Sequence, residues 1–122
     1  MSSVITSNIS DGTTSVPTGY VVNGSAKAWG QFNGTNTVAI SDSQNFSSIS
    51  DGGTGVYTCN LTNNMANASY AANGSTGESN TNGFIRVGGS ASSNIFVNSR
   101  VSTSGSTYDD AKVYISAHGD LA

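Results

Sequence analysis

Apolar and polar residues alternate with a period of two in short runs along the chain. In the clearest run, residues 56–61, Tyr57, Cys59 and Leu61 share one side of an extended strand. A second run covers residues 112–117. Such alternation predicts half-buried β-strands, and no stretch of the sequence shows a convincing helical period.

Turn residues separate these runs at short intervals, so many short strands are expected. The candidate strands are 20–22, 25–32, 37–40, 44–49, 54–62, 68–72, 84–87, 95–101 and 112–117. Asn-Gly pairs at 23–24, 33–34, 73–74 and 82–83, and Asp-Gly pairs at 11–12 and 51–52, are the predicted tight turns. The pattern predicts an all-β fold, a single small antiparallel sandwich or barrel-like domain over residues 20–122.

The composition first raises the question of disorder. Gly, Ser, Thr and Asn make up 64 of the 122 residues, and only 35% of the chain is hydrophobic. Disordered chains of this kind are usually rich in proline or net charge, whereas this chain has one proline and a net charge of −3. Because the apolar residues are mostly β-branched or aromatic and alternate, we favour the β-fold.

The sparse charge excludes some functions. The four cations are scattered along an acidic chain, which argues against nucleic-acid binding. No apolar run is long enough for a membrane-spanning helix, and the first residues do not resemble a secretory signal. Cys59 has no second cysteine to pair with. We expect no cofactor and no metal ligand set.

Residues 1–19 are Ser/Thr/Gly-rich and are predicted to form an extended N-terminal arm that ends in a turn near Pro17. Its isolated apolar residues Val4, Ile5, Ile9 and Val16 are candidate anchoring contacts. A monomer this poor in charge would expose unprotected strand edges. We therefore expect a homo-oligomer, with a trimer as the expected form.

Few residues suggest chemistry. His118 lies near the chain end without a nucleophile motif, and Asp109-Asp110 fits a turn better than a carboxylate pair or a calcium site, although structural calcium stays open. In the predicted strand 25–32, Lys27, Trp29 and Gln31 share one face. Trp29 either packs in the core or a subunit contact, which its size favours, or stacks on a sugar ring. No enzymatic activity is expected.

Several segments resemble a family of small virion and tail-fibre proteins of phages, many from marine and cyanobacterial hosts. Residues 23–35 are similar to its motif NGSAKAWVNFNGTGTV, and residues 37–43 to TVAIRDS. Residues 45–58 are similar to NVSSITDNGTGDYT. Weaker likenesses at 10–15, 65–71 and 113–120 extend the resemblance over most of the chain. Gly30 departs from the family, which has a larger residue there, and 78–108 match nothing in it.

The resemblance implies a virion structural protein, assembled in the host cytoplasm and released by lysis. A tail-fibre or receptor-binding component that attaches to the host surface is the expected function, and a capsid decoration or head-fibre protein is the alternative. Its expected partners are copies of itself, other virion proteins and a host surface glycan. Candidate variable recognition loops carry Asn80, Asn82, Ser99, Arg100 and Tyr108.

Overall fold

The computed structural model describes residues 1–77 and 83–122, with 53% of the chain in strands and 6% in a helix. The elements are β1 (Asn8–Ser10), β2 (Ser15–Pro17), α1 (Thr18–Gly24), β3 (Ala28–Asn33), β4 (Ala39–Gln44), β5 (Phe46–Asp51), β6 (Val56–Leu61), β7 (Ala71–Thr76), β8 (Gly83–Ala91), β9 (Asn94–Val101) and β10 (Val113–His118). The predicted all-β class is confirmed.

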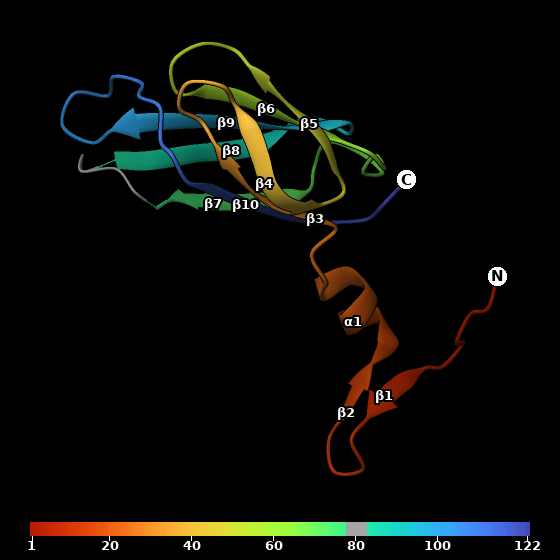
Figure 1. Cartoon of the computed structure of the whole chain (residues 1–122). Coiled ribbons are helices and arrows are strands. Elements are labelled where there is room, and N and C mark those ends of the chain that lie inside the picture. The colour runs from red at the N-terminus through yellow and green to blue at the C-terminus, as the bar shows by residue number, and fades with distance from the viewer. Residues whose placement is uncertain (78–82) are drawn as a thin grey trace.

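Eight strands form two packed sheets (Figure 1). Sheet B has the order β4-β3-β10-β7, and sheet C has the order β5-β6-β9-β8. Every pairing within them is antiparallel. The chain crosses between the two sheets four times, after β4, β6, β7 and β9. The β4–β5 and β7–β8 crossings each join the strands at matching edges of the two sheets.

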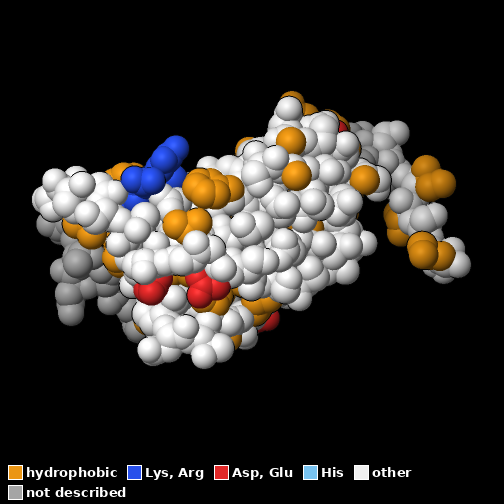
Figure 2. All heavy atoms as spheres, turned by 90° about the horizontal axis from the view of Figure 1, so that it is seen from above, with side chains coloured by type: hydrophobic (Ala, Val, Ile, Leu, Met, Phe, Trp, Pro, Cys, Tyr) orange, Lys and Arg blue, Asp and Glu red, His pale blue; other side chains and the backbone are white. Residues whose placement is uncertain are grey.

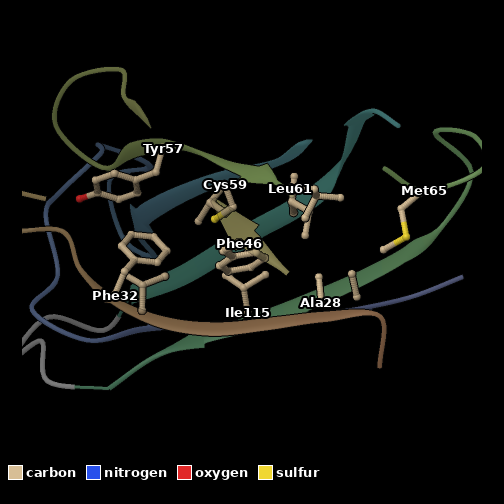
Figure 3. Close-up of a cluster of buried hydrophobic side chains, with 12 residues drawn as sticks. Ala28, Phe32, Phe46, Tyr57, Cys59, Leu61, Met65 and Ile115 are labelled. Carbon is tan, nitrogen blue, oxygen red and sulfur yellow. The ribbon is translucent and has the colours of Figure 1, made fainter. Parts of the chain in front are cut away.

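The core lies between the two sheets and is filled by the alternating residues that the sequence indicates. Residues 57, 59 and 61 of β6 are buried, as are 113, 115 and 117 of β10, which confirms both predicted alternations. Figure 3 shows side chains of both sheets meeting in this layer. Phe32 and Tyr57 pack edge to face across it, with ring centroids 5.2 Å apart.

The corner between the sheets is made by Asn45, which has a positive φ of 65°. Its amide nitrogen donates to the carbonyl oxygens of Lys27 and Asn63, at 3.1 and 3.0 Å. Its amide oxygen accepts the backbone N–H of Asn63 at 2.7 Å. Asparagine tolerates this conformation better than most residues, and its side chain ties three segments together at the corner.

The turn predicted at Asn73-Gly74 is wrong. Asn73-Gly74 lies in the middle of β7, where Asn73 is paired with Ser116 and Gly74 with Ile115. β10 supplies the pairing partner for this turn-like sequence, so tertiary context overrides local preference. The turn predicted at Asp51-Gly52 is present, and the Asp51 carboxylate there accepts the N–H of Gly53 at 2.9 Å.

Residues 1–24 lie outside the sandwich and project from it on the side of sheet B (Figure 1). We call them the hairpin–helix segment. β1 and β2 pair around a turn at Gly12, whose φ is +94°, and the Asp11 carboxylate accepts the N–H groups of Thr13 and Thr14 there. These two bonds lower the pKa of Asp11, and the bond from Thr14 has the larger effect. The segment buries no residue of its own.

The helix α1 overturns several predictions. The tight turn predicted at Asn23-Gly24 is wrong, because these two residues end the helix. Residues 20–22 are helical rather than a strand, and the predicted boundary at residue 19 falls inside α1. Pro17 precedes the first helical residue, with its φ of −56°, instead of forming a turn. A helix of seven residues is too short for its period to be visible, and Tyr-Val-Val favours strands locally.

Candidate functional site

The outer surface of sheet B carries two parallel rows of side chains, which we call the aromatic face. Strand pairing places residues of β4, β3, β10 and β7 side by side, and directly paired residues point to the same side of a sheet. The first row is Gln44, Trp29, Ser116 and Asn73, and the second is Asp42, Gln31, Tyr114 and Ser75. The face therefore carries two aromatic rings among amide, hydroxyl and carboxylate groups.

Trp29 lies on this outer surface and not in the core. It is 38% exposed, and its indole N–H donates to the side-chain oxygen of Gln44 at 2.8 Å. The expectation that Trp29 is buried in the core is therefore wrong. A subunit contact and stacking on a sugar ring stay predictions. The side chain is held by its hydrogen bond to Gln44 while part of its surface stays exposed to a partner. Gln31 is half-buried in the neighbouring row.

Tyr114 is the second aromatic residue of the face and was not singled out from the sequence. It is 39% exposed and diagonal to Trp29, since it pairs with Gln31 while Trp29 pairs with Ser116. Diagonal Cβ atoms in a sheet lie about 7–8 Å apart. The signal was available, because Tyr114 alternates with the buried Val113 and Ile115 and must therefore point outward.

A shallow hollow lies beside Tyr114. It has a volume of about 290 Å³ and is lined by Asn73, Gly74, Ser75, Tyr114, Ile115 and Ser116. The hydroxyl of Ser116 donates to the amide oxygen of Asn73 at 2.8 Å on its floor. A second hollow of about 340 Å³ shares Gly74 and Ser75 and reaches β8 at residues 83–85. The side chains that β7 contributes here are small, so the surface over β7 is recessed next to Tyr114.

Lys27 does not join the face as predicted. Its ammonium group donates to the carbonyl oxygens of Val22 and Ser25, the latter at 2.9 Å. These carbonyls lie at the C-terminal end of α1, where a positive charge is favourable. Lys27 therefore links the helix to the start of β3 and supplies no cation to the aromatic face.

The opposite surface of the sandwich has a different character. Figure 2 looks onto the sheet C side, where basic side chains lie beside hydrophobic ones. Phe84 and Arg100 are paired on this surface, and Arg86 lies opposite Asn98. In the two rows of the aromatic face, by contrast, Asp42 is the single charged side chain.

The predicted recognition residues are not gathered in one loop. Asn80 and Asn82 lie outside the described residues. Ser99 is fully buried in β9, so its assignment to a loop is wrong. Arg100 is also in β9, where it donates to the side chain of Asn98 and to the carbonyl of Gly105. Tyr108 packs against Gly83 and lies 3.3 Å from the Thr76 hydroxyl. The segment that matched no motif thus contains two strands of sheet C, the edge strand β8 and the buried strand β9.

The predicted anchoring residues are all exposed. Val4 and Ile5 lie before β1, whereas Ile9 and Val16 are directly paired across the hairpin. Three further exposed residues of α1, namely Tyr20, Val21 and Val22, were missed because they were read as a strand of the domain. Val21 joins Ile9 and Val16 around one hollow.

Asp109 and Asp110 are structural rather than a simple turn. The Asp109 carboxylate accepts the N–H of Gly55 and the hydroxyl of Tyr57, both at 2.7 Å. Burial is the main cause that raises the pKa of the Tyr57 hydroxyl, and its hydrogen bond to Asp109 raises this pKa further. Asp110 is 1% exposed, and its carboxylate accepts the N–H of Lys112. No cluster of three metal-ligating side chains occurs within residues 1–77 and 83–122.

The remaining reactive side chain, Cys59, lies in the core between the sheets. Burial raises the pKa of its thiol to about 12, so little thiolate forms at neutral pH. His118 ends β10 and is half-buried. Within the described part of the chain, no helix is long and apolar enough to cross a membrane.

Comparisons with known proteins add no family to this description. A scan against protein-family models and searches of curated proteins and of solved structures found no match for the chain.

Proposed function

We propose that the chain is a non-enzymatic structural protein of a bacteriophage particle, a tail-fibre or receptor-binding component that attaches to the host surface. The observation that carries this proposal is the uneven placement of exposed apolar residues. Of the twelve large hydrophobic side chains that are exposed among the described residues, eight belong to the hairpin–helix segment.

Such a segment is not expected to hold its structure unaided. The helix α1 has seven residues and buries none of them, and the hairpin has only two strands of three residues. Isolated helices this short and isolated two-stranded hairpins are marginal in water. Packing against another protein would stabilise both elements and remove their apolar side chains from water.

The sandwich itself supports a role as a displayed module. It has a complete core, few charges and short strands, and it is joined to the segment at one end only (Figure 1). A trimer of the segment would present three sandwiches side by side, and weak contacts of each with a host polymer would then add up. Residues 1–24 would hold the protein in the particle, and the sandwich would meet the host.

The test is the position and number of copies on the phage particle. Antibodies against the full chain, visualised by electron microscopy on purified virions, should label the tail tip or fibres. Quantitative mass spectrometry should give a few dozen copies or fewer. Hundreds of copies with label over the whole head would instead establish capsid decoration, and complete absence from purified virions would refute both.

A further inference from the structure

We propose that the aromatic face binds a neutral polysaccharide that lies across β3, β10 and β7. The inference rests on the proposed function, because it names the host-surface chemistry that the displayed sandwich would meet. It is carried by Trp29 and Tyr114, which are half-exposed on the same outer surface of sheet B, and by the hollow beside Tyr114.

The aromatic rings suit the apolar side of a sugar. A pyranose ring presents a face of C–H groups, which can stack on an indole or phenol ring, while its hydroxyl groups point outward from the rim. Trp29 is fixed by the bond to Gln44, so little rotamer entropy is lost when a ligand stacks on it. The diagonal offset of Tyr114 places the second ring on the next strand.

The polar groups of the face suit the rim of the sugar. Gln31, Asp42, Asn73, Ser75 and Ser116 bring amide, carboxylate and hydroxyl groups, which both donate and accept hydrogen bonds. A dry protein interface would desolvate these groups at a cost, whereas sugar hydroxyls replace the water that they lose. The two rows hold one carboxylate, Asp42, and the basic side chain of Lys112 lies next to Tyr114 beside Gly77. One group of each charge gives the face no excess of either sign, which favours a neutral sugar.

The hollows set the direction of the chain. The first hollow, of about 290 Å³, has the size of the smallest ligand pockets, which begin at about 300 Å³. The second hollow shares Gly74 and Ser75 with the first and is lined on its other side by residues 83–85 of β8. A linear polymer would thus run perpendicular to the strands, from Trp29 past Tyr114 and over the small side chains of β7.

The single tryptophan of the chain makes the test direct. The intrinsic fluorescence of the full-length protein is recorded during titration with glucans, mannans and polymers of N-acetylglucosamine, and with polysaccharide extracted from the host surface. Because Trp29 is the only indole, a saturable change in its emission reports contact at the face itself. The absence of any change with all four probes overturns the proposal.

Variants then locate the contact. Tyr114→Ala should weaken binding about tenfold or more, as truncation of a central aromatic contact commonly does. Phe96→Ala is the matched control, because Phe96 is a half-buried aromatic residue on the outer surface of sheet C, opposite Thr58 and Gly88. Trp29→Ala, measured by retardation in gels containing the polymer, should lose binding while its melting temperature changes little.

The competing occupant is a second copy of the chain, since the hairpin–helix segment projects on the same side of the sandwich (Figure 1). If Trp29→Ala and Tyr114→Ala lower the oligomer mass in light scattering, the face is a subunit contact and the proposal is wrong. Normal host adsorption by a virion-bound Tyr114→Ala protein also refutes it, while the proposed function stands. Polysaccharide binding by a protein absent from virions refutes the proposed function alone.

Discussion

Gly30 and Phe46 form a packed pair of a small and a large residue between β3 and β5. A Cβ atom at position 30 would lie 2.6 and 2.7 Å from two ring carbons of Phe46, and 3.1 Å from the Cβ of Ser43. We infer that the glycine makes room for the phenylalanine ring, so the sizes of the two residues compensate each other.

The two single substitutions should each destabilise the sandwich. Gly30→Val drives a side chain into the ring, and such overpacking costs about 1–3 kcal/mol, offset by up to about 1 kcal/mol of strand preference. Phe46→Val removes most of a buried ring, at about 2–4 kcal/mol, slightly below the usual cost of Phe→Ala. In the double variant the valine side chain introduced at position 30 fills part of the vacated space.

The double variant should therefore be more stable than the sum of the single effects by about 1–3 kcal/mol, the range for coupled neighbours. Urea unfolding followed by circular dichroism measures all four proteins of the cycle. Gly88→Val serves as the control, because a Cβ there meets nothing within 4 Å. Additive effects within about 0.5 kcal/mol, the limit for independent sites, would refute the compensation.

Contacts elsewhere in the chain lead to three further predictions. A protein that starts at Ser25 should keep the melting temperature of the full chain in differential scanning calorimetry, because none of residues 1–24 is buried. A large drop in melting temperature would show that residues 1–24 fold together with the sandwich. Asp109→Ala should cost about 1–3 kcal/mol in urea unfolding, since it leaves the Gly55 N–H and the Tyr57 hydroxyl without their acceptor, whereas Asp109→Asn, which keeps an oxygen, should cost less. The free energy of unfolding should keep its full value below pH 9 and fall as the pH rises toward 12, because burial raises the pKa of Cys59 from 9.0 to about 12 and the thiol of the unfolded chain ionises first. Cys59→Ala should make this decline shallower in urea unfolding measured at several pH values. An unchanged slope in that variant would refute the role of Cys59.

The central strands could be predicted because their own residues alternate. β6 and β10 each place three apolar residues on one side, and both lie inside their sheets, where one face is buried. Only the start of β7 could be predicted, in the candidate strand 68–72, since Asn73-Gly74 is a turn sequence that becomes a strand only through its pairing with β10. The helix α1 escaped detection because two turns carry too little periodicity.

The site could be predicted only in part, for the same reason. The alternation around Trp29 placed it correctly beside Gln31, and the outward position of Tyr114 was implicit in the burial of its neighbours. The roles of Lys27 and Asp109 depend on hydrogen-bond partners that cannot be identified from the neighbouring residues in the sequence. Lys27 meets carbonyls of a helix that was read as a strand, and Asp109 meets Tyr57, which is 52 residues away in the sequence.

The hairpin–helix segment and the aromatic face use different residues on different elements, so their effects should separate. Ile9 and Val16 pair on the hairpin, and Val16→Asp would place a charge in any apolar contact that the segment makes. We expect this variant to be monomeric in light scattering. Its binding to a short oligosaccharide, measured by Trp29 fluorescence, should match that of the unmodified chain. Its binding to a long polymer should weaken, since linked sites raise apparent affinity by about 10²–10⁴-fold. A loss of short-oligosaccharide binding in Val16→Asp would show that the face is completed by a neighbouring subunit, and the separation would then fail.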